Sequence, residues 1–416
     1  MADVLLPRAV MPNVLAALAD TPVVVVNGPR QAGKTTLVKA LSYPGTSEFV
    51  TLDEPTARSA AAADPRAFVE RPVDTLVVDE VQLEPSLFRA IKASVDADRR
   101  PGRFLLTGSS RLLSAPDMAD SLVGRVETVD LWPFAERELI DATGPSFVDT
   151  IFDQPGRLLR SAPGTRVEIG ERLLRGGFPE VIRRQPARRR VWFDNYVRTI
   201  TQRVIRELAD LERLADIPRL LSLCGARTGT ELNAASIAGE LGIPARTISV
   251  HLAHLATAFL VRLVPAWSTN LSAKVVRRPK LVMADVGLAA HLQGVTVSGL
   301  ARPQTQLGPL LETFVATELL RQLSWSQNSA TLWHFRDRSG VEVDLLLEYP
   351  DGRIVGIEVK ATGTPRASDL KGLRFLADRL GDRFHFGFLL SGASQATPFG
   401  PKLATLPVSR LWQPVG

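Results

Sequence analysis

A run of β-branched residues that leads straight into a glycine-rich loop constrains the fold of this chain more than any other feature. Residues 22–27 read PVVVVN, which is typical of a strand buried on both faces of a sheet. Residues 28–36 read GPRQAGKTT and match the pattern G-x-x-x-x-G-K-[ST] in full, and the following LVKAL continues as a helix. Strand, loop and helix in this order are the context in which the pattern forms a phosphate-binding loop.

The chemistry of phosphate binding explains why these residue types are needed. Gly28 and Gly33 let the backbone wrap a phosphate with its N–H groups at the start of a helix. Lys34 places a charge against the β and γ phosphate oxygens, and Thr35 offers a hydroxyl ligand to Mg²⁺. The loop therefore predicts ATP and Mg²⁺ as cofactors. The candidate ATP-binding residues are Gly28, Pro29, Arg30, Gln31, Ala32, Gly33, Lys34, Thr35 and Thr36.

A second apolar strand is predicted at residues 75–80, which read TLVVDE and end in two adjacent carboxylates. Asp79 is the candidate that holds the metal through water. Glu80 is the candidate that orients or polarises the attacking water. Two surface acids at the end of a strand are the alternative interpretation. Their place downstream of a complete phosphate-binding loop favours the catalytic one.

Two further residues are candidates for the same site. Residues 103–110 read RFLLTGSS, and Ser109 at the end of this predicted strand is a candidate sensor of the γ-phosphate or of the attacking water. A strand that simply ends in a turn is the alternative. Arg125, in SLVGR at 121–125, is a candidate arginine finger that acts in trans, which predicts a homo-oligomer. An ordinary surface arginine is equally compatible with the sequence.

These strings, in this order and spacing, resemble the AAA-type ATPase domain of a bacterial and archaeal family in which the ATPase precedes a DUF4143 region. The wider group is the archaeal-type ATPases, near the STAND NTPases. The resemblance implies an αβα ATPase core over residues 1–150. The string RGGFPE at 175–180 is also similar to the family and makes Arg175 a candidate nucleotide sensor, and PKLVMADVGL at 279–288 resembles the DUF4143 signature.

The middle of the chain predicts two modules. Residues 151–215 are rich in arginine and are expected to form a helical lid, whose charged face is either solvated or contacts nucleic acid. Residues 216–295 are expected to form a winged helix, because NAASIAGELGIPARTISVHLAHL at 233–255 has the form of a helix-turn-helix. Its second helix is expected to expose Arg246, Thr247, Ser249 and His251, so both DNA contact and protein–protein contact remain open.

Residues 296–416 predict a nuclease-like α/β domain. A helix over 308–322 carries Glu312 and Glu318, and a hairpin with a Pro-Asp-Gly-Arg turn carries Asp344, Glu358 and Lys360. Glu358 and Lys360 share a face, since side chains alternate along a strand. This is the D…ExK pattern of the PD-(D/E)xK nuclease fold, without the usual proline.

In that nuclease-like interpretation, Asp344 and Glu358 are candidate Mg²⁺ ligands and Glu312 is an additional acid. Lys360 would activate water beside the metal. The alternative is a salt-bridged hairpin on a scaffold that does not cut.

Composition excludes some classes and permits others. One cysteine, Cys224, rules out an intramolecular disulfide framework, and five scattered histidines offer no zinc-binding spacing. A net charge of +6 permits contact with DNA or RNA. The sequence lacks a signal-peptide pattern and an apolar run of about 20 residues, so we expect a cytoplasmic α/β protein without a membrane span. Two functions remain: an ATPase acting on or with nucleic acid, and a STAND-like nucleotide-controlled switch with a non-cutting C-terminal scaffold.

Overall fold

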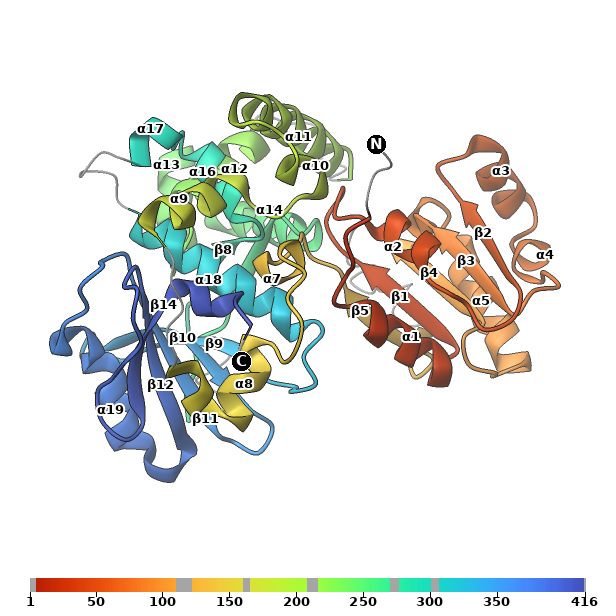
Figure 1. The fold of residues 1–416 in the computed structure, drawn as a ribbon. Coiled ribbons are helices and arrows are strands. Elements are labelled where there is room, and N and C mark those ends of the chain that lie inside the picture. Colours follow the sequence, from red (N-terminus) through yellow and green to blue (C-terminus); the bar gives the residue numbers. More distant parts are fainter. Residues whose placement is uncertain are drawn as a thin grey trace. The chain divides into compact units, whose positions relative to one another are not determined.

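The computed structural model describes residues 5–109, 122–159, 165–207, 216–269, 277–300 and 307–414 (Figure 1). The chain forms two compact units. Unit 1 comprises Met1–Pro133 and Thr257–Phe259, and unit 2 comprises Phe134–Ala256 and Leu260–Gly416. Ser110 and Ser121, which belong to two of the predicted motifs, lie outside the described residues. Among the helices that the structure describes, none has the length and apolarity needed to cross a bilayer.

Unit 1 contains a five-stranded sheet whose strands are all parallel. The order is β2-β3-β4-β1-β5, so β4 lies between the two strands that carry the predicted nucleotide motifs. Because the strands are parallel, their carboxyl ends meet at one edge. The strands are β1 (Val23–Asn27), β2 (Ser47–Thr51), β3 (Thr75–Asp79), β4 (Phe104–Gly108) and β5 (Val126–Asp130).

Helices surround this sheet. Val23 and Val25 join the core that also contains Leu87, Ile91 and Val95 of the amphipathic α5, while the alternate valines of β1 are equally buried on the other face. The run of valines therefore forms a strand covered on both faces, as the sequence predicts. The helices are α1 (Met11–Asp20), α2 (Lys34–Ala40), α3 (Pro55–Ala63), α4 (Pro65–Val69) and α5 (Ser86–Ala97).

Unit 2 begins with helices. The short α7 and α8 lie within the residues predicted to belong to the ATPase domain, but they belong to the second compact unit. The predicted boundaries at 150, 215 and 295 otherwise stay predictions. The helices before the first strand are α7 (Glu136–Leu139), α8 (Phe147–Asp153), α9 (Arg166–Arg175), α10 (Pro179–Ile182), α11 (Pro186–Glu207) and α12 (Asp216–Ala226).

A small antiparallel sheet follows a pair of helices in unit 2. The helices α13 (Ala234–Leu241) and α14 (Ala245–Thr257) are joined at Gly242, which ends α13 with a φ of 72°. The sheet order is β6-β8-β7, with β6 (Thr230–Glu231), β7 (Val261–Val264) and β8 (Lys280–Met283). His251, predicted to be exposed on α14, is buried instead. Its position between Ile248 and Leu255 places it on the apolar side of the helix.

The end of the chain forms a six-stranded mixed sheet of order β13-β14-β12-β11-β10-β9. Helix α18 (Gly308–Leu323) packs on β11, and α19 (Lys371–Leu380) packs on β10, β11 and β12. The helices α16 (Val286–Leu292) and α17 (Val297–Leu300) precede α18. The strands are β9 (Thr331–Arg336), β10 (Glu342–Glu348), β11 (Ile354–Lys360), β12 (Phe384–Ser391), β13 (Thr397–Pro398) and β14 (Leu403–Pro407).

Candidate nucleotide-binding site

The predicted phosphate-binding loop connects β1 to α2. Gly33 precedes α2 with a φ of 96°, and Gln31 also has a positive φ of 63°. At Gly28 a side chain has no room, because a Cβ there would lie 2.1 Å from the backbone oxygen of Leu131. The loop thus adopts turns that glycine permits and that larger residues at these two glycine positions would disturb.

Lys34 is held against this loop. Its Nζ donates to the backbone oxygens of Gly28 at 2.9 Å and Pro29 at 3.1 Å, and the side chain is buried. The ammonium therefore lies at the loop itself, where phosphate oxygens would be bound. Thr36, on α2, is exposed, as is Gln31 in the loop.

Asp79 and Thr35 come together although 43 residues separate them in the sequence. The Thr35 hydroxyl lies 3.1 and 3.0 Å from the two carboxylate oxygens of Asp79. Two other hydroxyls, those of Thr107 at 2.5 Å and Thr51 at 3.4 Å, also donate to this carboxylate. Hydroxyl and carboxylate oxygens are hard ligands, and Mg²⁺ in nucleotide sites uses one or two carboxylates together with phosphates. The residues present therefore fit a magnesium ion that arrives with ATP.

Glu80 lies beside this pair and is fixed by several hydrogen bonds. Its backbone has a φ of 57°, and its N–H donates to the Thr107 hydroxyl at 3.0 Å. The Ser109 hydroxyl donates to Glu80 Oε2 at 2.8 Å. Gln82 donates to the same oxygen and, at 3.2 Å, to the Ser109 hydroxyl. The structure thus brings the predicted sensor Ser109 to the predicted water-orienting carboxylate.

Three residues of this neighbourhood were missed by the sequence analysis. Thr107 binds both Asp79 and Glu80, and Gln82 binds Glu80. Gln82 follows two residues after the Asp79–Glu80 pair and so had a signal, whereas Thr107 looks like an ordinary strand residue. Arg8 had no signal at all. It is buried and donates to the backbone oxygen of Ala32 in the loop at 3.0 Å and to that of Trp132.

Arg125 is not brought to the phosphate-binding loop of its own chain. It immediately precedes β5, at the edge where the parallel strands begin, and Val23 at the start of β1 donates to its backbone oxygen. Its guanidinium donates to the carboxylate of Asp96 on α5 at 2.6 Å. The predicted role in trans stays a prediction.

The predicted C-terminal metal ligands also meet, but around a cation that belongs to the chain. The Lys280 ammonium, supplied by β8, forms an ion pair with Glu312, lies 3.7 Å from Asp344 Oδ1 and donates to the Asp344 backbone oxygen. Asp344 Oδ2 accepts from the backbone N–H of Val359 at 2.9 Å. Glu358 accepts from Lys360 Nζ at 2.9 Å.

Ammonium groups of the chain occupy the positions next to these carboxylates. An ammonium already contacts two of the three candidate ligands, and a second ammonium contacts the third. No group of three metal-ligating side chains occurs in the described part of the chain. The prediction that Glu312, Asp344 and Glu358 hold Mg²⁺ stays a prediction, and the structure adds to it Lys280, a buried lysine that lies outside the D…ExK pattern and pairs with two of these carboxylates.

The pKa shifts in the cluster agree with an ion pair between Lys280 and the carboxylates. Burial raises the pKa of Glu312 to about 7, and the Lys280 ammonium offsets part of that rise. Burial lowers the pKa of Lys280, but the neighbouring Glu312 and Asp344 carboxylates outweigh it, so the net shift is upward. Lys280 therefore stays charged at neutral pH and serves as the counter-ion of the carboxylates.

The fold and the loop define the class of this protein. A parallel sheet with a glycine-rich loop after β1 and a carboxylate pair after β3 is that of a P-loop ATPase domain. One family model agrees with this class, and two others match later parts of the chain. Residues 20–140 match the AAA domain model, residues 166–299 match DUF8612 and residues 307–411 match DUF4143, the last two being domains of unknown function.

The chain therefore combines an AAA-type ATPase domain with a C-terminal DUF4143 region. One detail of the sequence analysis is wrong. The string at 279–288, assigned to the DUF4143 signature, lies outside the residues matched by DUF4143 and inside the stretch matched by DUF8612.

The chain is similar to whole proteins as well. Uncharacterized protein Rv2008c of Mycobacterium tuberculosis and Uncharacterized protein Mb2031c of Mycobacterium bovis are each 29% identical over 357 residues, which is 85% of this chain and 73% of theirs. Solved structures also match the chain. The Walker-type ATPase PABY2304 of Pyrococcus abyssi shows 16% identity and a TM-score of 0.40 over 70% of this chain and 96% of its own. AMPPCP-bound DnaA from Aquifex aeolicus shows 15% identity and a TM-score of 0.26 over 60% and 86%.

Proposed function

We propose that this protein binds ATP with Mg²⁺ in unit 1 and hydrolyses it. The observation that carries the proposal is the contact of Thr35 with Asp79 beside a Glu80 carboxylate fixed by Ser109 and Gln82. A binding module has no use for a positioned carboxylate next to its metal ligands.

The residues have distinct roles in this proposal. The loop amides and Lys34 hold the β and γ phosphates. Thr35 and Asp79 hold Mg²⁺, which when bound neutralises charge that develops on the phosphate oxygens. Glu80 orients the attacking water and accepts its proton, and Ser109 keeps Glu80 in place.

The test separates binding from hydrolysis. Lys34→Ala is expected to abolish ATP binding, whereas Glu80→Gln is expected to bind ATP and hydrolyse it at least about a hundredfold more slowly. Glu84→Gln, at a half-buried acid four residues farther on whose carboxylate accepts from Ser86, is the matched control and is expected to leave turnover unchanged. Native turnover in Glu80→Gln would refute the assignment of Glu80.

Action on nucleic acid is the next part of the proposal. The helices α13 and α14, followed by the β7–β8 hairpin, support the predicted winged helix, with Arg246 and Ser249 exposed on α14. We expect single-stranded DNA, duplex DNA or RNA to stimulate ATP hydrolysis, with binding that weakens steeply as salt rises. ATP turnover that is the same with and without all three polymers would contradict only this part of the proposal.

Assembly into a homo-oligomer, with Arg125 as an arginine finger in trans, is a separate part of the proposal. It is tested by Arg125→Ala, which would lower turnover without lowering ATP affinity.

The ion pairs of Lys280 with Glu312 and Asp344 favour a second candidate function. In it, the C-terminal region is a docking scaffold that does not cut, and ATP controls a STAND-like switch. DNA and RNA are incubated with the protein and Mg²⁺ or Mn²⁺. We expect the wild-type protein to cleave neither polymer more than Asp344→Ala does. Cleavage lost in Asp344→Ala would overturn this candidate and restore the nuclease interpretation.

A further inference from the structure

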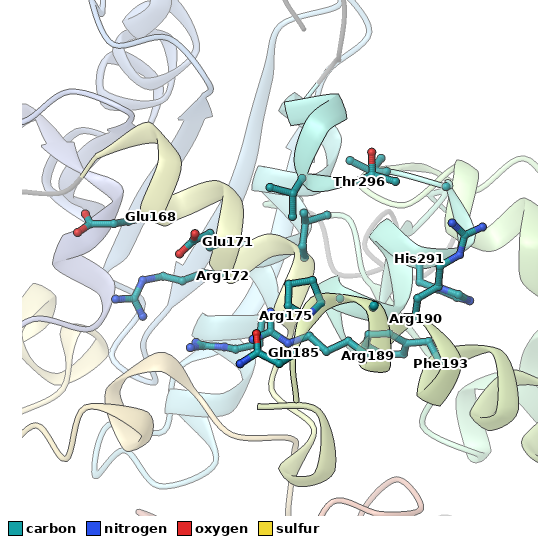
Figure 2. Close-up of a pocket in the computed structure, with 17 residues that line it drawn as sticks. Glu168, Glu171, Arg172, Arg175, Gln185, Arg189, Arg190, Phe193, His291 and Thr296 are labelled. Carbon is teal, nitrogen blue, oxygen red and sulfur yellow. The ribbon is translucent and has the colours of Figure 1, made fainter. Parts of the chain in front are cut away.

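A cavity of about 920 Å³ lies entirely within unit 2, between α9, the start of α11, α16 and α17 (Figure 2). Its volume is in the range of small-molecule sites. All of its lining residues fall within residues 166–299, the stretch matched by DUF8612. It shares no residue with the phosphate-binding loop, so neither the ATPase chemistry nor the C-terminal charge cluster accounts for it.

One wall of the cavity is cationic. Arg189 and Arg190 project from the first turn of α11, Arg190 beside His291, and Arg175 comes from α9 (Figure 2). Burial and the neighbouring Arg175 guanidinium lower the pKa of Arg189. Two guanidiniums held this close repel each other unless an anion lies between them.

The existing partners leave part of this charge uncommitted. Arg175 Nη2 pairs with Glu136, but its buried Nε has no hydrogen-bond partner among the described residues. Arg189 uses its Nε for the backbone oxygen of Arg184, at 2.6 Å, which leaves its two terminal nitrogens for a ligand. The carboxylates of Glu168 and Glu171 also line the cavity, and Glu171 acts on the pKa of Arg189. Arg172 is directed to Glu136 and to the ring of Trp412.

The remainder of the lining is apolar. Leu174, Val295 and Val297 line the cavity, and Val297 is 52% exposed. The ring of Phe193 also lines it and stacks on His291 with centroids 5.4 Å apart. A ligand that satisfies both walls has an anionic group at one end and an apolar or planar body at the other.

We propose that this cavity binds a small phosphorylated molecule with a planar ring, of the size of a mononucleotide. Its phosphoryl group would be held by Arg175 and Arg189, since guanidinium groups bind phosphate oxygens in pairs. Its ring would lie along the apolar wall. Arg189 runs toward Arg175, whereas Arg190 lies on the side of His291 (Figure 2). Two arginines paired inside a cavity favour a small molecule over a nucleic acid strand.

The test uses the full chain carrying Lys34→Ala, so that the phosphate-binding loop does not bind the probe. AMP, adenosine and inorganic phosphate are titrated by calorimetry. AMP is expected to bind at least about tenfold more tightly than either fragment. Arg189→Ala is expected to weaken AMP binding by about tenfold, and Arg190→Ala, at an exposed side chain beside His291, is expected to weaken it by a smaller factor. Arg188→Ala, on the same helical turn but outside the cavity lining, is the matched control and is expected to change it less than twofold.

The contrary outcomes are distinct. Equal affinity for AMP and adenosine would overturn the phosphate assignment, and an equal loss in Arg188→Ala would mean non-specific attraction to a basic surface. A single-stranded oligonucleotide that binds more tightly than AMP and loses affinity in all three arginine variants would identify a nucleic acid surface instead. Absence of AMP binding at millimolar concentration would also overturn the proposal. The ATPase proposal is tested separately, by ATP hydrolysis with Lys34 intact, and its outcome does not depend on whether AMP binds to the cavity.

Discussion

The hydroxyl of Thr107 on β4 makes hydrogen bonds to both Asp79 and Glu80. It donates to Asp79 Oδ1 at 2.5 Å and accepts from the Glu80 N–H at 3.0 Å, and it is fully buried. A single group on β4 therefore binds both the carboxylate proposed to hold the metal and the backbone of the residue proposed to orient water. This explains why β4 must lie next to β3 in the sheet.

Replacing Thr107 by valine tests this role. Thr107→Val keeps the shape but leaves a buried carboxylate and a buried N–H without a partner, at a cost of about 1–3 kcal/mol in unfolding free energy. We expect ATP turnover to fall by at least about tenfold. Thr75→Val, which removes the hydroxyl bond to Gly102 at the opposite end of the sheet, is expected to lower stability but not turnover. Equal turnover in both variants would contradict the role. Urea unfolding and a phosphate-release assay provide the measurements.

His334 gives a prediction of pH dependence. Burial, together with the Lys280 ammonium, lowers its pKa from 6.5 to about 4. The unfolded chain therefore binds a proton that the folded chain does not, and this contribution to stability is present above pH 6.5 and is lost as pH falls toward 4. It amounts to about 3 kcal/mol. Gln at this position keeps a donor for the Arg278 backbone oxygen, so His334→Gln is expected to flatten the acid slope of unfolding free energy. An unchanged slope would contradict the assignment.

At the scale of elements, β8 connects two sheets of unit 2. It is the central strand of the small sheet, and its Lys280 reaches Glu312 on α18 and Asp344 on β10. A buried ion cluster of this kind fixes how elements dock, because each charge is tolerated only while its partners are present.

Removal of this ammonium is expected to destabilise unit 2 strongly. Lys280→Met leaves buried carboxylates unpaired, which costs about 3–5 kcal/mol, and the additional change Glu312→Met should recover part of that loss. Arg336→Met removes a half-exposed arginine whose acidic partners are 3.7 and 3.8 Å away, and is expected to cost less than about 1 kcal/mol. Denaturant unfolding distinguishes these expectations. A Lys280→Met protein as stable as Arg336→Met would contradict the importance of the cluster.

At the scale of the whole molecule, the nucleotide site belongs to one compact unit and the lysine cluster and the arginine-lined cavity to the other. We therefore expect two thermal transitions. Mg²⁺–ATP at about a hundred times its dissociation constant should stabilise unit 1 by about 2.7 kcal/mol. Calorimetry with wild-type protein should show one transition move, and Lys34→Ala should abolish the shift. A single transition that moves as a whole would mean that the units unfold together.

Local sequence patterns were sufficient where the residues of the site are adjacent in the sequence or follow directly after a strand. The loop from Gly28 to Thr36 was predictable because its glycines and its flanking strand and helix are contiguous. Asp79, Glu80 and Ser109 were predictable because each follows an apolar strand, and the carboxyl ends of parallel strands share one edge.

What could not be predicted depends on which elements lie side by side. Nothing in the residues around Thr107 says that β4 separates β1 from β3, and nothing near Arg8 says that it reaches the backbone of Ala32. Lys280 precedes Asp344 by 64 residues and comes from another sheet, so the D…ExK pattern was recognised without its counter-ion. Long-range packing, rather than propensity, decided each of these cases.

The assignment of Thr257–Phe259 to unit 1 has a consequence for how this protein is made. The Phe259 ring packs edge-on against Trp132 at 5.4 Å, so the ATPase unit lacks this contact until more than half of the chain has been synthesised. During synthesis, residues 134–256 leave the ribosome before Thr257–Phe259, so unit 1 is still incomplete while this part of unit 2 is being made. A gene truncated after residue 133 would express an ATPase domain with an exposed tryptophan in place of a closed core.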